Sequence, residues 1–142
     1  SKAHTGDSYY LEQTNFYQKN LLPKIKKTNM LDNIVEKNNL PFPDFIKIDT
    51  QGSEIDILKG GQKVVESCKI ILLECPIIQY NLGSPNLSEY INYLNSINFV
   101  PHDICETHNI DQVLIQIDIL FIKKSIINDI NHDKKILNIL NS

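Results

Sequence analysis

The pattern of apolar and polar positions predicts alternating strands and helices along most of this 142-residue chain. Residues 1–22 are polar and aromatic without a clear period, so we expect an irregular segment with room for one short strand. Apolar runs predict strands at 24–28, 45–49, 70–75, 99–105 and 113–123. Helical spacing predicts a helix between a cap at Asn29 and a stop near Asn38, one from Ser53 with a break near Gly60, and helices over 87–97 and 125–140.

Two of these segments indicate how the sheet is built. The run IILLEC at 70–75 is apolar almost throughout, which is typical of a strand buried on both faces of a parallel sheet. Leu87, Ile91 and Leu94 follow at spacings of four and three, as in an amphipathic helix. The element order therefore predicts an α/β fold with a mostly parallel sheet that ends in an antiparallel strand pair.

Composition restricts the class of protein. Hydrophobic residues make up 42% of the chain and charged residues 22%, as in a soluble globular domain, and the length fits one domain. The chain has no run of 18 apolar residues, so the sequence predicts no membrane-spanning helix. A net charge of -3 without a basic block argues against nucleic acid as the main partner. Three cysteines without CxxC spacing predict neither a disulfide framework nor a zinc site, and they favour a reducing, cytoplasmic setting.

The most informative segment is IKIDTQGSEIDILKG at residues 46–60. An apolar strand ends in Asp49, a Thr-Gln-Gly turn follows, and a helix starts at Ser53 and Glu54. Ligands of open α/β sheets bind just beyond the carboxyl ends of the strands. A carboxylate at this position is therefore placed to meet a substrate.

Each candidate residue in this segment also has a purely structural interpretation. Lys47 shares a strand face with Asp49, so it could stabilise a developing anion or form an ion pair that fixes the end of the strand. Glu54 could act in catalysis, or it could be a first-turn acid that the helix dipole favours. Gly52 could contact a ligand, but a turn residue with positive φ is the simpler interpretation.

Other candidates lie further along the chain. Glu74 and Pro76 end the next strand and should lie beside Asp49 if the two strands are neighbours. Tyr9 and the adjacent Tyr10 could line a pocket, although scattered aromatic residues more often serve packing. The metal-ligand types near residues 102–108 lack a recognised metal spacing, so we favour a loop without a metal there.

The run that begins FIKIDTQGSEIDILKG at Phe45 and continues to Glu74 closely resembles the central block of FkbM-type methyltransferases. That block has a Lys-Ile-Asp-x-x-Gly-x-Glu core followed by Leu-Lys-Gly. The segments TNMLD at 28–32, QIDILF at 116–121 and TGDSYY at 5–10 also resemble that family. The resemblance implies a Rossmann-like class I methyltransferase fold and S-adenosyl-L-methionine as the methyl donor.

The resemblance also implies that a part of such a domain is missing. Methyltransferases of this class hold the donor with a Gly-rich turn after the first strand and an acid after the second, and neither feature occurs in these 142 residues. We therefore expect residues 1–142 to be a single partial methyltransferase domain without the first nucleotide-binding strands, either a fragment of a larger enzyme or a natural truncation. We also expect the chain alone not to hold the donor tightly. A partner chain, including a second copy in a homo-oligomer, stays an open alternative for covering the unpaired sheet edge.

The activity that the resemblance implies is methyl transfer to a hydroxyl oxygen of a sugar or another small metabolite. In this reading Asp49, Lys47 and Glu54 are catalytic, Asp49 and Gly52 also bind the donor, and Glu74, Pro76 and Tyr9 contact the acceptor. An ordinary Asp pKa of about 3.9 is low for a base, so Asp49 would need burial or a neighbouring carboxylate to raise it, and Glu54 or Glu74 could be that neighbour. The alternative function is a non-catalytic, methyltransferase-like binding or interaction module.

Overall fold

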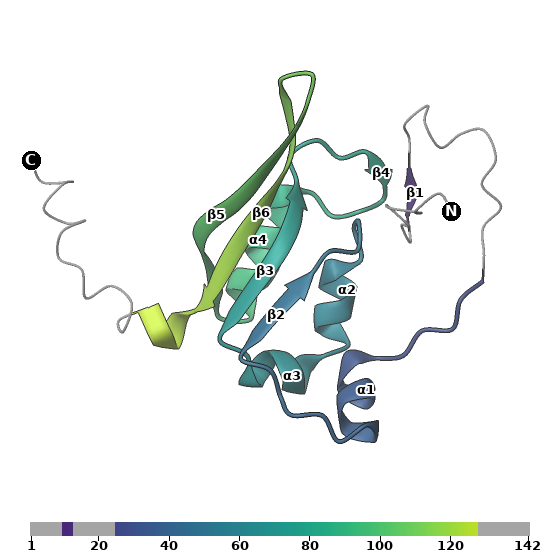
Figure 1. Cartoon of the computed structure of the whole chain (residues 1–142), viewed down its shortest axis with the longest axis vertical. Helices are drawn as coiled ribbons and strands as arrows, with labels where there is room; N and C mark the ends of the chain where they lie inside the picture. The colour runs from purple at the N-terminus through teal and green to yellow at the C-terminus, as the bar shows by residue number, and fades with distance from the viewer. Residues whose placement is uncertain (1–9, 13–24, 128–142) are drawn as a thin grey trace, which may run out of the picture.

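The computed structural model describes residues 10–12 and 25–127, which form a sheet with helices packed on it (Figure 1). The strands are β1 (Leu11–Glu12), β2 (Phe45–Ile48), β3 (Ile70–Pro76), β4 (Asn81–Leu82), β5 (Phe99–Ile110) and β6 (Val113–Lys123). The helices are α1 (Leu31–Lys37), α2 (Glu54–Lys59), α3 (Gln62–Ser67), α4 (Leu87–Ser96) and the 3-10 turn η1 (Lys124–Ile126).

The main sheet has four strands in the order β2-β3-β6-β5, and β1 pairs separately with β4. Only β2 and β3 run parallel, whereas β6 is antiparallel to both of its neighbours. The α/β class and the antiparallel β5-β6 pair are confirmed. The prediction of a mostly parallel sheet is wrong for the described residues, because the antiparallel hairpin inserts its second strand directly beside β3 and so contributes most of the strand pairing.

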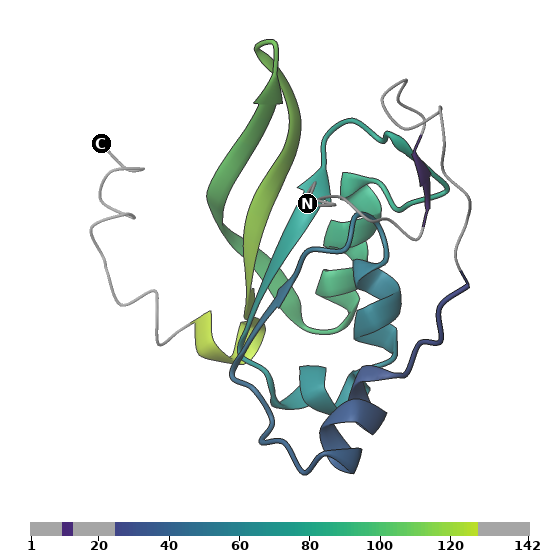
Figure 2. The same ribbon diagram turned by 45° about the vertical axis from the view of Figure 1, so that its right-hand side comes forward.

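Helices α2, α3 and α4 lie on one face of this sheet (Figure 2) and share a core with it. Burial therefore alternates along β3: Leu73 and Cys75 are fully buried in that core, while Leu72 and Glu74 on the opposite face are partly exposed. The expectation that β3 is buried on both faces is wrong, since the described helices cover one face only.

The β5-β6 hairpin extends past the carboxyl ends of β2 and β3 (Figure 1). Asp111 and Gln112 form its tight turn, both with positive φ (49° and 69°), as in two-residue hairpins whose twist matches that of the strands. The predicted strand 99–105 is therefore too short, and the predicted loop around 102–108 is strand. Its polar side chains project from the exposed part of the hairpin, so they do not interrupt backbone pairing with β6.

Of the remaining predicted elements, some are confirmed, some are wrong and some lie outside the described residues. The helices at α1, α2 with α3, and α4 are confirmed, and the break near Gly60 separates α2 from α3. The cap of α1 is Met30 and not Asn29, and residues 25–28 are not a strand. Residues 128–140 of the predicted last helix, and Tyr9, lie outside the described residues.

Within the described part of the chain, no helix combines the length and the apolar character needed to cross a membrane.

Candidate functional site

Four carboxylates, three on strands and one directly after β2, lie in a row on the sheet face opposite the helices. Glu74 on β3 is the register partner of Asp118 on β6, and Asp118 is in turn the partner of Glu106 on β5. Asp49 follows Ile48, whose partner precedes Glu74, so Asp49 continues the row at the end of β2. Directly opposed residues of paired strands point to the same face. We call Asp49, Glu74, Asp118 and Glu106 the carboxylate row.

Glu54 is fully buried, and it holds the turn that positions Asp49. Its carboxylate accepts hydrogen bonds from Thr50 N–H (2.9 Å), Thr50 Oγ1 (3.1 Å) and Gly52 N–H (3.0 Å). The hydroxyl of Tyr90 on α4 also donates to it. Burial, followed by the hydrogen bond and the charge of Glu54, raises the pKa of Tyr90. A buried carboxylate is stable only when several donors compensate it, and here those donors come from the turn and from Tyr90.

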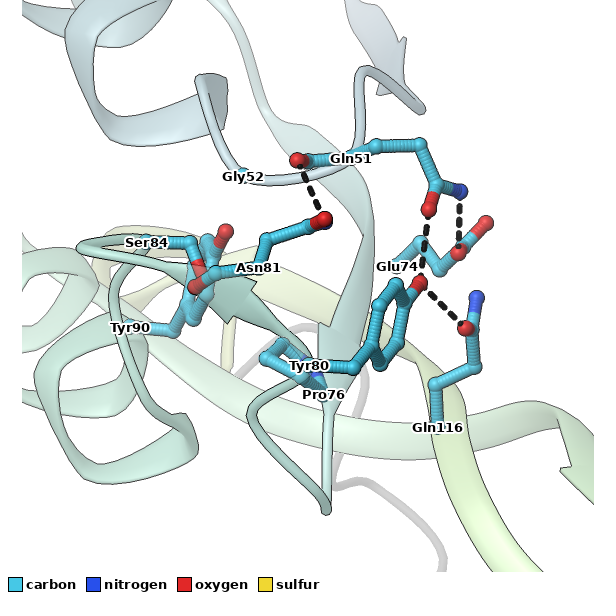
Figure 3. A pocket seen from close by; sticks show the side chains of 9 residues that line it. All are labelled: Gln51, Gly52, Glu74, Pro76, Tyr80, Asn81, Ser84, Tyr90 and Gln116. Atoms are coloured by element: carbon cyan, nitrogen blue, oxygen red, sulfur yellow. Dashed lines mark hydrogen bonds between the residues drawn. The ribbon is translucent and has the colours of Figure 1, made fainter. Parts of the chain in front are cut away.

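Both the backbone conformation at position 52 and the close approach of its neighbours require glycine there. Its φ is +118°, and a Cβ at this position would lie 2.8 Å from Ser84 Cβ and 2.9 Å from a ring carbon of Tyr10. Gln51, just before it, has a positive φ of 59°. This pair of backbone conformations turns the chain sharply between β2 and α2, and it directs the Gln51 side chain over the end of the sheet (Figure 3).

A chain of amide and phenol groups connects Glu74 to the far side of the site (Figure 3). Gln51 Nε2 donates to Glu74 Oε1 at 2.8 Å. The Tyr80 hydroxyl lies 2.6 Å from Gln51 Oε1 and 2.9 Å from Gln116 Oε1. A hydroxyl carries one proton and so donates to only one of these oxygens. The network holds one oxygen of Glu74 in a fixed position.

A small cavity lies beside this network. Its volume is about 20 Å³, and it is lined by Gln51, Gly52, Glu74, Pro76, Tyr80, Asn81, Ser84, Tyr90 and Gln116. A space of this size holds about one water molecule. Asn81 Nδ2 donates to the Gln51 carbonyl at 3.0 Å, but Asn81 Oδ1 is buried without a hydrogen-bond partner among the described groups. This oxygen is an acceptor ready for a water or a ligand donor.

Glu74, which lies next to Asp49 in the carboxylate row, has a raised pKa. Burial, and then hydrogen bonding to and the charge of Asp49, raise the pKa of Glu74 to about 7. Lys47 Nζ lies 3.8 Å from Asp49 Oδ2, and the two side chains are 50% and 46% exposed. A carboxyl group with a pKa near 7, such as that of Glu74, can hold and release one proton under physiological conditions.

The predicted site residues are distributed over three environments. Gly52, Glu74 and Pro76 line the cavity, whereas Asp49 and Lys47 are not among its lining residues and form a half-exposed ion pair. Glu54 is enclosed beneath the turn. The roles assigned to these residues stay predictions, and Tyr9 lies outside the described residues.

Several residues of the site were not predicted from the sequence. Gln51 and Gln116 lie inside the two segments that resemble the methyltransferase family, so the signal was present. Tyr80 follows β3 in a loop and Asn81 begins the short strand β4, and no pattern in the sequence predicts that they return toward Gln51.

Comparison with known proteins identifies the family of this chain. A profile of the methyltransferase FkbM domain matches residues 2–101. A stretch of 48 residues is 33% identical to the hexuronic acid methyltransferase AglP of Haloferax volcanii, and it covers 34% of this chain and 20% of that relative. The match therefore spans about a fifth of the relative's length. No solved structure matches the chain. Because the profile match covers more than half of the chain, the protein belongs to the methyltransferase FkbM domain family.

Proposed function

We propose that the chain forms the acceptor-side part of an S-adenosylmethionine-dependent O-methyltransferase, which acts on a hydroxyl group of a sugar or of another small hydroxylated metabolite. The observation that carries this proposal is the Asp49–Glu74 pair at the carboxyl ends of the parallel strands β2 and β3. Membership of the family supports methyl transfer. The name of the relative, a hexuronic acid methyltransferase, supports a sugar as acceptor.

The carboxyl pair supplies the proton acceptor that this reaction needs. When bound, S-adenosylmethionine supplies an electrophilic methyl group. The acceptor hydroxyl must lose its proton as its oxygen becomes a nucleophile, and Glu74 or Asp49 takes that proton. Lys47, close to Asp49, stabilises the negative charge that develops on the acceptor oxygen. Gln51 and Tyr80 keep the Glu74 carboxyl in place and limit its rotation.

The described residues fit one edge of the methyl donor and not the whole molecule. The carboxylates and Asn81 Oδ1 can accept hydrogen bonds from hydroxyl and ammonium groups of that molecule. Ligand pockets usually enclose about 300–1,000 Å³, whereas the cavity here encloses about 20 Å³. We therefore propose that residues 1–142 form a partial domain, and that parts of the protein outside the described residues supply most of the donor site.

Glu54 fits a positioning role within this proposal. All of its hydrogen-bond donors belong to its own turn or to Tyr90, and its side chain does not line the cavity. It acts on Asp49 through the turn.

The first experiment is calorimetric titration of S-adenosylmethionine into this chain and into a version extended upstream of Ser1 by the sequence that its gene encodes. We expect weak binding by the chain alone and clear binding by the extended version. Absence of binding in both would contradict the proposed activity.

The second experiment replaces Asp49, one of the two candidate bases, in the version that binds the donor. Asp49→Asn should lower turnover by about 100-fold or more, as loss of general-base catalysis does, with little effect on unfolding. Asp56→Asn is the matched control, because Asp56 is an exposed acid on α2 whose side chain, among the described residues, contacts Lys59 (3.5 Å) and Tyr10 (3.5 Å). Equal turnover of Asp49→Asn and the parent protein would remove Asp49 from the mechanism.

A non-catalytic binding module is the second candidate function, and the small volume of the cavity favours it. It predicts that the gene starts near Ser1 and that an unextended chain folds and stays monodisperse without any methyl transfer to sugar acceptors. A Gly-rich nucleotide turn encoded in frame upstream would argue for the enzyme.

A further inference from the structure

The far end of the carboxylate row combines three metal-ligand types. Glu106 and His108 on β5 and Asp118 on β6 each present one ligand atom, and these three atoms lie within 4.8 Å of one another. We propose that these residues bind a divalent transition-metal ion of the Zn²⁺ class. Metal binding needs no methyl donor or acceptor, so this inference stands or falls independently of the proposed function.

The backbone builds this group of ligands. Glu106 is the register partner of Asp118, and His108 lies two residues further along the same strand, so all three side chains point to one face. Irregularities in the register follow Ile104 and His108. Bulges of this kind locally redirect side chains and are common beside functional sites.

The distances suit a metal ion. His108 Nε2 lies 3.2 Å from Asp118 Oδ1. Two ligands bound to Zn²⁺ at their usual distances of about 2.0–2.1 Å are about 3.3 Å apart at a tetrahedral angle. These two atoms therefore already have the separation of metal ligands. Glu106 is exposed and can close the remaining gap by a change of rotamer.

The charges at this end of the row favour a cation. Asp118 is only 5% exposed, and a buried carboxylate is costly without a positive partner. None of the ion pairs between described residues joins a lysine to Glu74, Glu106 or Asp118; the single partner is His108.

The mixed donor set selects the class of metal. Imidazole favours Zn²⁺ and neighbouring transition metals over Mg²⁺ and Ca²⁺, which prefer oxygen ligands alone. Three protein ligands leave at least one position for water or for an oxygen of a bound molecule, as in catalytic zinc sites. This open position would face the same side of the sheet as Asp49 and Glu74.

The test is calorimetric titration of ZnCl₂ into the metal-free chain. Cys105 is an exposed thiol on the same strand and could itself bind zinc, so every variant carries Cys105→Ser. We expect one ion per chain, and we expect His108→Gln and Asp118→Asn each to weaken binding by about 100-fold, because loss of even an indirect ligand contact costs 10–100-fold. His102→Gln, which changes the same residue type on the same strand outside the group, should leave binding unchanged.

A second measurement separates binding from folding. The ¹⁵N signal of His108 Nε2 should shift on addition of one equivalent of Zn²⁺, while the unfolding temperature of each variant reports whether it still folds. Equal zinc affinity in the parent, His108→Gln and Asp118→Asn proteins would overturn the proposal. So would loss of the ion with Cys105→Ser alone, or an unshifted His108 signal at saturation.

Discussion

The hydroxyl of Tyr90 on α4 donates a hydrogen bond to the fully buried carboxylate of Glu54, 36 residues earlier in the chain. This contact connects the helical layer to the turn that carries Asp49. It explains why a charged residue occupies the core directly beneath the motif: the carboxylate organises the amide groups of the turn, and the helix supplies its last donor.

Tyr90→Phe removes this donor and leaves the rest of the side chain in place. A hydrogen bond to a charged group contributes about 1.5–3 kcal/mol, so we expect the free energy of unfolding to fall by about 2 kcal/mol. Urea unfolding measures this change. Tyr93→Phe on the same helix is the control, because its ring keeps the contact with Lys59 (5.9 Å to the ring centre). Equal stability of the two variants would show that the contact with Glu54 is unimportant.

Gly52→Ala should be strongly destabilising. The new Cβ would come within 3 Å of Ser84 Cβ and of Tyr10, and the φ of +118° is strained for any other residue. Such backbone strain alone costs about 1–3 kcal/mol, and the clash adds to it. Gly60→Ala is the matched change, because φ there is -80° and the nearest atoms are 3.5 Å away. That variant should be neutral or slightly stabilising. Thermal unfolding compares the two, and an unchanged melting temperature of Gly52→Ala would contradict the account of this turn.

The pairing of Asp49 with Glu74 could be predicted from the sequence, because both residues end strands that are joined by one crossover connection. The parallel register of β2 and β3 confirms that the two strand ends are neighbours. Cys75, between Glu74 and Pro76, points into the core instead, as the alternation along a strand requires.

The other half of the carboxylate row could not be predicted in the same way. Asp118 and Glu106 meet Glu74 only because β6 pairs antiparallel with β3, at a register that depends on contacts distant in sequence. The polar residues of β5 resemble a loop because that part of the hairpin is exposed, and patterns of burial carry no signal where neither face is buried.

The pKa of Glu74 makes a prediction about stability and pH. This pKa is raised from 4.5 to about 7 in the folded chain, first by burial and then by Asp49. Between these values the folded chain keeps a proton that the unfolded chain has released. The free energy of unfolding should therefore fall as pH rises from about 4.5 to about 7, and this contribution should change no further above that range.

Glu74→Gln cannot titrate, so it should lose this part of the pH dependence. Because the site is only half-buried, solvent screening reduces the effect. We expect the change in unfolding free energy across this pH range to differ between the two proteins by on the order of 1–2 kcal/mol. Urea unfolding at intervals between pH 4.5 and pH 8 gives the two curves. Asp49→Asn should shift the transition to lower pH without abolishing it, because burial, the largest cause, remains. Parallel curves for the parent protein and Glu74→Gln would show that Glu74 titrates normally. That result would contradict the proposal that the carboxyl pair holds a proton at neutral pH.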